Sequence, residues 1–301
     1  GGRDVARSFR VTTRSLLLFV LTLTLVLSPG LSAPALALRV VSLYPGHSDN
    51  VVALGGAESL VGLSENDDPD LLPNLPRFSR ETGAEAILAL SPDVVLMRGL
   101  TQRANPGLAD VLQRAGVRVE SIDPPSWDGF ADYLRALAGI LGLAPESGVE
   151  RLEATRAAIR QEAAARREAA GGRAPRVFLE ATARELHTCA PGSWAAHLIE
   201  LAGGENAARE AEPIREGSAL APWGLERVLK LLEDGLDVYL VQQGAMNAST
   251  LEAVRARPWA GALERTRLAA MPENLLSRPS LLGLERGGRL LMDVLYGEAA
   301  R

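Results

Sequence analysis

Short runs of apolar and β-branched residues alternate with helical patterns along most of this chain. In the first half the strand-like runs cover residues 39–43, 60–63, 94–97 and 117–121, and the helical stretches cover residues 49–54, 84–90 and 107–115. In the second half the strand-like runs cover residues 176–179, 238–241 and 268–271, and the helical stretches cover residues 193–202, 225–232 and 281–295. This alternation is typical of parallel α/β units. It therefore predicts an α/β fold with two parallel-sheet lobes.

A segment of different composition separates the two halves. Residues 147–170 are rich in Ala, Glu and Arg and contain no proline. Ser147 and Glu150 match a helical capping box, and Gly171 follows the segment as a helix terminator. A helix of this length spans roughly 35 Å, about the width of a small domain. The predicted organisation is a signal peptide at 1–37, an N-terminal lobe at 38–144, a bridging helix at 145–172 and a C-terminal lobe at 173–301, with a ligand cleft between the lobes.

The first residues predict export from the cytoplasm. Four arginines precede the apolar run 16–27, and Ala35-Leu36-Ala37 is a small-x-small cleavage pattern. The run is short for a membrane span, which needs about 20 residues. We therefore expect cleavage before Leu38 and a periplasmic protein, and the alternative is a retained anchor helix. Cys189 is the only cysteine, so no cysteine stands at the cleavage site to accept a lipid. We also expect a monomer.

The chain carries few signs of catalytic chemistry. A net charge of -5 without a basic stripe argues against nucleic-acid binding. No P-loop, dinucleotide-binding glycine motif, nucleophile elbow or HExxH motif is present. His187 and Cys189 leave a thiol hydrolase as an alternative, although no third orienting residue or oxyanion-hole motif accompanies them. The acidic positions 67, 68 and 70 are predicted to form a solvated turn.

The three histidines differ in their predicted surroundings. His197 lies within a predicted helix, whereas His47 and His187 each follow a predicted strand. In open parallel sheets, ligands bind at the loops that follow the carboxyl ends of strands. His47 and His187 are therefore predicted either to face each other across a cleft or to be loop histidines with local partners.

Several segments together resemble the helix-bridged (class III) periplasmic binding proteins of ABC importers, whose members carry cobalamin, ferric siderophores or haem. The resemblance covers essentially the whole chain after residue 38. The segments that carry it are RVVSLYPGHSDNVVALGGAESLVGLS, GAEAILALSPDVVLM, VLQRAGVRVESID, RVFLEA, CAPGSWAAHLIELAGGENAA and LERVLKLLEDGLDVYLV. It implies the same two-lobed architecture with one bridging helix, a non-catalytic binding function, and a permease and its ATPase as partners.

The resemblance also implies roles for individual residues. The residues implied to contact the ligand are Tyr44, Pro45, Gly46, His47, Arg98, His187, Trp223, Gln242, Gln243 and Arg278. Two acidic residues, Glu85 and Glu226, match the positions that dock such proteins onto arginines of the permease. Their alternative role is to stabilise the first turns of their helices.

The expected ligand is a metal chelate. The chain has Ser79-Arg80-Glu81-Thr82 where some cobalamin carriers have a tryptophan, so the ligand need not be cobalamin. Trp223 and Tyr44 would offer flat surfaces to a corrin or porphyrin, and Arg98 and Arg278 would suit the anionic groups of a chelate. His47 and His187 are candidate axial ligands of an iron or cobalt centre. We expect no intrinsic cofactor. The alternatives are capture of a bare metal ion, the thiol hydrolase, and a sensor or scaffold with the same fold.

Overall fold

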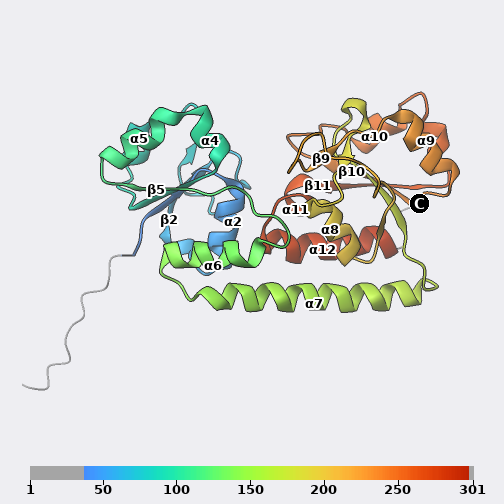
Figure 1. Ribbon diagram of the computed structural model, residues 1–301, viewed down its shortest axis with the longest axis horizontal. Helices are drawn as coiled ribbons and strands as arrows, with labels where there is room; N and C mark the ends of the chain where they lie inside the picture. Colours follow the sequence, from blue (N-terminus) through green and yellow to red (C-terminus); the bar gives the residue numbers. More distant parts are fainter. Residues whose placement is uncertain (1–36, 298–301) are drawn as a thin grey trace, which may run out of the picture. The chain divides into compact units, whose positions relative to one another are not determined.

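The computed structural model describes residues 37–297, and the sheets and helices of this part of the chain are shown in Figure 1. Residues 1–36, which hold nearly all of the predicted signal peptide, lie outside the described residues. From Leu38 onward the chain forms one compact unit. Within residues 37–297 no helix is both long and apolar enough to cross a membrane.

The first sheet contains five parallel strands in the order β3-β2-β1-β4-β5. These strands are β1 (Val40–Ser42), β2 (Leu60–Ser64), β3 (Arg77–Phe78), β4 (Val94–Met97) and β5 (Arg118–Ser121). The helical elements connected to them are α2 (Pro45–Ala53), η1 (Ala57–Ser59), α3 (Ala84–Leu88), α4 (Gly99–Ala104), α5 (Pro106–Arg114) and α6 (Phe130–Leu141). The strand order doubles back at β1, which places the carboxyl ends of β1 and β4 at a topological switch point.

The second sheet has four parallel strands in the order β11-β10-β6-β8. These are β6 (Arg176–Glu180), β8 (Glu205–Asn206), β10 (Val238–Gln243) and β11 (Arg267–Pro272), and β7 (Thr188–Cys189) pairs antiparallel with β9 (Leu220–Ala221). The helical elements of this half are η2 (Arg184–Leu186), α8 (Trp194–Leu201), α9 (Leu225–Glu233), α10 (Leu251–Arg255), η3 (Ala260–Leu263), α11 (Glu273–Leu276) and α12 (Leu281–Tyr296). The predicted parallel α/β class is confirmed for both halves.

Helix α7 (Pro145–Ala169) connects the two sheets and runs along α6 and α12 (Figure 1). Its start differs from the prediction. Pro145 occupies the first turn and Ala144 is the N-cap, so Ser147 lies inside the helix and donates a hydrogen bond to the Ala144 carbonyl. The predicted capping box is therefore wrong, because proline at the first helical position moves the N-cap three residues earlier, from Ser147 to Ala144. Gly171 and Gly172 end the helix with positive φ, as predicted.

The strands bury side chains on both faces, as in a sheet covered by helices on each side. In β4, Val94 and Leu96 belong to one apolar cluster, and Val95 and Met97 belong to another. In β10, Val238 and Leu240 share the cluster of Val94, whereas Tyr239 and Val241 belong to a third. One face of each sheet therefore contributes to the same apolar cluster.

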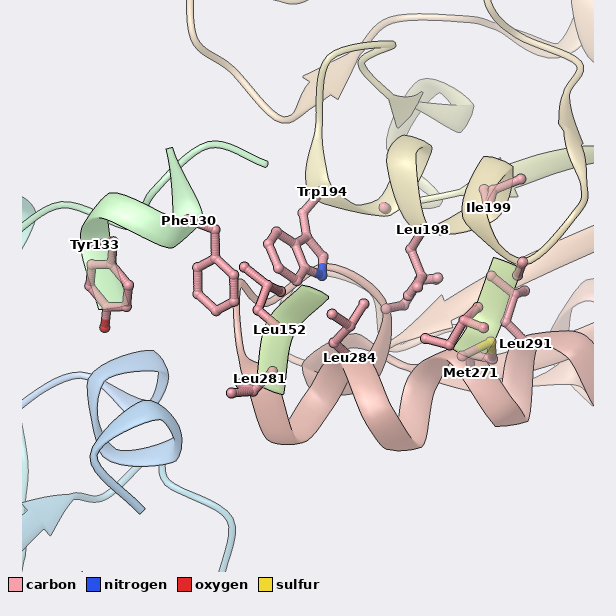
Figure 2. Close-up of a cluster of buried hydrophobic side chains, with 14 of the residues drawn as sticks. Phe130, Tyr133, Leu152, Trp194, Leu198, Ile199, Met271, Leu281, Leu284 and Leu291 are labelled. Carbon is pink, nitrogen blue, oxygen red and sulfur yellow. The ribbon is translucent and has the colours of Figure 1, made fainter. Parts of the chain in front are cut away.

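This shared core is filled by helices α6, α7, α8 and α12 (Figure 2). Phe130 of α6 lies edge-on to Trp194 of α8, with ring centroids 4.9 Å apart. Leu152 of α7 and Leu284 of α12 are fully buried in the same cluster. The prediction assigned no helix to residues 130–141, and α6 is the main element that it missed.

Candidate functional site

Tyr44 ends the segment that follows β1 and is the N-cap of α2. The helix begins at the very next residue because Pro45 supplies the fixed φ that suits a first turn. Pro45 and Gly46 are buried, and a Cβ on Gly46 would overlap the Tyr44 ring. The predicted loop 44–47 is therefore the first turn of a helix, and Gly46 leaves the space in which the phenol ring lies.

Arg98 follows β4 and lies against the Tyr44 ring. Its guanidinium carbon is 5.0 Å from the ring centroid, and its buried Nε has no hydrogen-bond partner among the described residues. Burial raises the pKa of Tyr44, while the positive charges of Arg98 and Arg278 oppose that rise. The structure thus brings together three of the predicted ligand-binding residues, from the segments after β1 and β4 and the segment before α12.

His47 is not placed as predicted. It lies inside α2, is fully buried, and has both ring nitrogens in hydrogen bonds. Nε2 lies 3.2 Å from the Met97 carbonyl and 3.0 Å from the Ile122 carbonyl, so Nε2 carries the proton and donates it. Nδ1 then accepts from the Tyr133 hydroxyl at 2.8 Å. Burial lowers the pKa of His47 to about 4. The structure gives no support to an axial-ligand role, because neither nitrogen is free to bind a metal.

Arg278 is paired with a carboxylate that the sequence did not single out. Its Nη1 lies 3.3 Å from Oδ2 of Asp49 in α2, and both side chains are largely buried. The neighbouring Asn50 donates to the Pro279 carbonyl at 3.0 Å and accepts from the Leu281 N–H at 2.9 Å. The first helix of one half is therefore fixed to the start of α12 in the other by an ion pair and two hydrogen bonds.

Asp67 contradicts the prediction of a solvated acidic turn. It is 3% exposed, and its Oδ2 accepts the Ser64 N–H at 2.9 Å while its Oδ1 has no partner among the described residues. Burial raises the pKa of Asp67 to about 6, and the nearby Asp49 charge acts in the same direction. The neighbouring Asp70, by contrast, is exposed as predicted.

Gln242 and Gln243 end β10 and differ in their accessibility. Gln242 is buried and accepts a hydrogen bond from the Ser277 hydroxyl. Gln243 is half-buried and donates to the Ser249 carbonyl at 3.1 Å. Both amides are thus engaged within the protein, and Gln243 is the more accessible of the two.

The segment after Gln243 is held in place by a buried ionic network. Glu180, at the end of β6, accepts two hydrogen bonds from Arg257 at 2.6 and 2.9 Å, one from Tyr239 at 2.5 Å and one from Asn247 at 3.1 Å. Burial alone would raise the pKa of Glu180, but these hydrogen bonds hold it below its ordinary value. The network anchors the loop after β10 to β6, one of the two central strands of the second sheet.

His187 follows η2, where Glu185 and Leu186 adopt positive φ angles of 51° and 47°. Its side chain is 13% exposed, and Nε2 lies 3.4 Å from a Glu185 carboxylate oxygen without an aligned hydrogen bond. His187 therefore remains a candidate axial ligand. Helix α8 carries His197, whose ring stacks on Trp127 at a centroid distance of 5.3 Å, so it packs within the helix layer.

Cys189 weighs against the thiol hydrolase. It is a free cysteine, 2% exposed, and burial raises the pKa of its thiol to about 11. A nucleophilic cysteine needs the opposite shift, because the thiolate is the reactive form. The bare-ion alternative also has no assembled site in the described part of the chain: within residues 37–297 no three His, Cys, Asp or Glu side chains gather as a metal-binding group.

Trp223 does not present an open face. The guanidinium carbon of Arg227 lies 3.5 Å from the indole centroid, and Phe178 of β6 packs against Trp223 with ring centroids 6.3 Å apart. Gly224, the next residue, has a positive φ and donates its N–H to the Glu185 carbonyl at 3.1 Å. Trp223 is therefore held next to the η2 segment that precedes His187.

The two predicted docking residues lie in corresponding positions. Glu85 is in the first turn of α3 and Glu226 is in the first turn of α9, and both are exposed. Exposed carboxylates at helix starts fit the helix dipole as well as a partner surface. Their role in docking stays a prediction.

A surface hollow elsewhere on the second half shares no residue with this set. It has a volume of about 440 Å³ and is lined by Arg255, Ala260, Gly261, Leu263, Glu264, Thr266, Arg267 and Leu268. The candidate site is therefore defined by side chains around Tyr44 and Trp223, not by that hollow.

The doubly wound sheets, the connecting helix and the residues at the strand ends define a solute-binding protein of the helix-bridged type. The model of the family described as "Periplasmic binding protein" matches residues 40–274. The chain belongs to this family.

One relative and two solved structures illustrate what the chain is similar to in sequence and in fold. A vitamin B12-binding protein of Salmonella paratyphi A is 32% identical over 172 residues, which is 56% of this chain and 61% of the relative. The match thus spans less than two thirds of that relative. A possible iron-binding periplasmic protein of Staphylococcus epidermidis superposes with a TM-score of 0.66 at 17% identity, covering 86% of this chain and 98% of the other. A periplasmic heme-binding protein of Pseudomonas aeruginosa superposes with a TM-score of 0.65 at 23% identity, covering 87% and 93%.

Sequence reasoning missed Asp49, Asp67 and Arg227. Asp49 and Arg278 are 229 positions apart, so a single sequence gives no sign that they pair. Trp223 and Arg227 are four positions apart, but Trp223 precedes the N-cap Gly224 and lies outside α9, so the helical i,i+4 spacing does not explain their contact.

Proposed function

We propose that this protein is the periplasmic solute-binding component of an ABC importer, that it captures a metal chelate, and that it delivers the chelate to the permease. Family membership, two relatives described as binding vitamin B12, and structural neighbours described as binding heme or iron support this function. No bond of the chelate is made or broken in this function. The ligand is cargo, with iron or cobalt as the candidate metals.

The observation that carries the proposal is the pair Tyr44 and Arg98 at the carboxyl ends of adjacent parallel strands. This edge of a doubly wound sheet is where ligands bind. A phenol ring offers a flat surface, and a guanidinium without a carboxylate partner offers hydrogen-bond donors to an anionic group. Within the second half, His187 and Gln243 are the remaining candidates that are only partly buried.

The groups near Tyr44 are packed or paired within the protein. Pro45, Gly46 and His47 are buried in the first turn of α2, and Arg278 is paired with Asp49. A chelate that binds against this surface would lose little water from the protein side, because most of these groups already have protein partners. Binding therefore requires little rearrangement of α2.

Delivery rests on Glu85 and Glu226. We place them on the surface that meets the permease, since two separated carboxylates fix orientation and speed the encounter more than they add affinity. Their exposure and their matching positions in α3 and α9 support this placement.

The test is a titration of the mature protein with haemin, cyanocobalamin and a panel of ferric siderophores, followed by absorbance and metal analysis. We expect stoichiometric binding of one chelate class. Replacing Arg98 by Gln should weaken it about tenfold or more, the size expected for a hydrogen bond to a charged group.

Two variants serve as controls. Arg103→Gln changes an exposed arginine of α4, and Cys189→Ser changes the buried thiol; both should keep the wild-type affinity. Loss of binding in Cys189→Ser with an unchanged melting temperature, or the absence of binding to every chelate by the wild type, would contradict the proposed function.

A further inference from the structure

Arg227 covers the surface that Trp223 was expected to offer. Its guanidinium carbon lies 3.5 Å from the indole centroid, which is contact distance between two flat groups. An upright guanidinium at this height would drive one of its nitrogens into the ring, so the two planes are close to parallel. Trp223 also packs with Phe178 in the apolar cluster of the second sheet. A macrocycle therefore cannot stack on the indole face that Arg227 covers while Arg227 is in place.

A guanidinium held flat on an aromatic ring keeps its N–H edges free. Stacking uses the face of the group, whereas its hydrogen bonds lie in its plane. The attraction between the cation and the ring stabilises this arrangement. Arg227 is thus a positioned donor group whose bidentate edge is available.

Arg227 has no carboxylate partner among residues 37–297, a property that it shares with exposed arginines of its half such as Arg255, but unlike Arg255 it lies on an aromatic ring. The ion pairs of that half use other cations, namely Arg173, Arg209, Lys230 and Arg257. Arg98 resembles Arg227 in lying on an aromatic ring, that of Tyr44, and it too has no ion pair in the described part of the chain. Arg278, in contrast, is paired with Asp49.

Arg98 and Arg227 therefore combine an aromatic ring with the lack of an ion pair among the described residues, whereas Arg257, which lies over Trp259, is paired with Glu180. Arg98 follows β4, and Arg227 lies in the first turn of α9, which leads into β10. The Trp223 segment is tied to the η2 segment before His187 by the Gly224–Glu185 hydrogen bond. Both arginines thus stand at the carboxyl-end edges of the parallel sheets, where ligands of such folds bind.

We propose that Arg227 is a ligand-binding side chain that recognises an anionic group, and that the cargo is accordingly an anionic chelate bearing carboxylates or comparable oxyanions, not a neutral corrinoid. This inference rests on the proposed function and specifies its ligand class. Arg98 and Arg227 act as the two anion-recognising groups, and Arg278 serves to tie α2 to α12.

The experiment compares two ligands with one macrocycle and different charge. Haemin carries two propionates, and iron protoporphyrin IX dimethyl ester carries the same ring without them. Both are titrated by absorbance into the wild type and into Arg227→Gln, with Arg255→Gln, an exposed arginine of α10, as the matched control. Cyanocobalamin is the neutral reference. If the wild type binds a ferric siderophore instead, an anionic ferric tris-catecholate is compared with ferrioxamine B.

We expect the wild type to prefer the anionic member of the pair by about tenfold or more, and Arg227→Gln to remove most of that preference. The expected loss for the anionic ligand is about ten- to a hundredfold, the size for a hydrogen bond to a charged group. The ester should lose little, and Arg255→Gln should behave as wild type.

Three outcomes would overturn the inference while leaving the proposed function intact. One is unchanged affinity of Arg227→Gln for both ligands. A second is an equal loss of affinity for both ligands, which would mean that Arg227 contacts the macrocycle and does not recognise the anionic groups. The third is a wild type that binds cyanocobalamin most tightly. A wild type that binds no chelate would instead contradict the proposed function itself.

Discussion

His47 and Asp67 are both buried in the first half of the chain, yet burial acts on them in opposite directions. Burial lowers the pKa of His47 to about 4 and raises the pKa of Asp67 to about 6, because it disfavours the charged form of each group. His47 releases its proton more readily in the folded protein than in the unfolded chain, where its pKa has the ordinary value of 6.5. Its contribution to stability is present above about pH 6.5 and is lost as the pH falls toward 4.

The ionisation of Asp67 changes stability in the opposite direction over nearly the same pH range. Its folded pKa of about 6 exceeds the ordinary 3.8, so its contribution is present below about pH 3.8 and is lost as the pH rises through 6. Two groups with opposed slopes partly cancel in the wild type. Removing either group therefore leaves the pH dependence of the other unopposed.

Asp67→Asn should therefore change how stability depends on pH. Asparagine keeps an oxygen for the Ser64 N–H but cannot ionise, so the variant should gain stability relative to wild type as the pH rises from about 4 to about 6. The full gain should be about 3 kcal/mol, from a shift of about two pKa units. Urea unfolding at pH 4.5, 5.5 and 7 measures it. Asp70→Asn, at an exposed position, should show no such trend, and a difference between Asp67→Asn and wild type that is constant with pH would contradict the burial argument.

Elements with a complete local pattern were predictable from the sequence. Strand β4 has the predicted bounds. Its four residues are all apolar and buried, and a polar residue stands on each side of them. The two-residue strands β3, β7, β8 and β9 were missed because two residues carry no periodicity. Helix α6 does carry an amphipathic pattern, with Tyr133, Leu134, Leu137, Ala138 and Leu141 buried, so it was within reach of the sequence.

In the candidate site, too, some features could be predicted from the sequence and others could not. Tyr44 and Arg98 follow predicted strands, and the structure brings them together because the carboxyl ends of adjacent parallel strands meet. The burial of His47 was not predictable, because its partners Tyr133 and Ile122 come from distant segments. A histidine in a polar sequence motif is predicted to be exposed, and only the tertiary structure shows which groups bind its two ring nitrogens.

Two helical glycines show that the packing of an element decides what a substitution does. Gly287 of α12 is buried, and a Cβ there would overlap the backbone carbonyl of Leu275 in α11. Gly139 of α6 is exposed and has open space at the same position. Both lie in helix interiors, where alanine is preferred to glycine by about 1 kcal/mol.

Gly287→Ala and Gly139→Ala should consequently have opposite effects. Gly139→Ala should raise the free energy of unfolding by up to about 1 kcal/mol, the difference in helix propensity. Gly287→Ala should lower it by about 1–3 kcal/mol, since the backbone of α11 must move to admit the methyl group. Thermal and urea unfolding of the two variants measure both effects. A stabilised Gly287→Ala protein would show that α11 and α12 pack less closely than the structure has them.

The shared core determines how the whole molecule responds to ligand and to damage. One face of each sheet packs into the same cluster through α6, α7, α8 and α12, so the two halves are not separate domains joined only by a helix. The Arg151 guanidinium of α7 adds a link, since it contacts both the Ala53 carbonyl at 2.8 Å and Glu285 at 2.7 Å. A large hinge motion would expose this core, so ligand capture is expected to involve only small displacements.

A shared core also predicts that the two halves unfold together. Leu112 belongs to the outer cluster of the first sheet, and Leu231 belongs to the outer cluster of the second. If the halves were independent, Leu112→Ala would weaken only the first sheet. With a common core, loss of one half exposes the other half's apolar face, so the cost of about 2–5 kcal/mol for a buried leucine should be felt in both.

Native-state hydrogen exchange measures this coupling directly. The slowest amides of β4 and β10 should lose the same protection in Leu112→Ala, and the same pair should respond equally to Leu231→Ala. Equal responses to both substitutions are required, because a cooperative unit has one global unfolding free energy. A loss that is confined to β4 in the first variant and to β10 in the second would mean that each sheet unfolds on its own. The cluster between them would then be an interface between two stable domains.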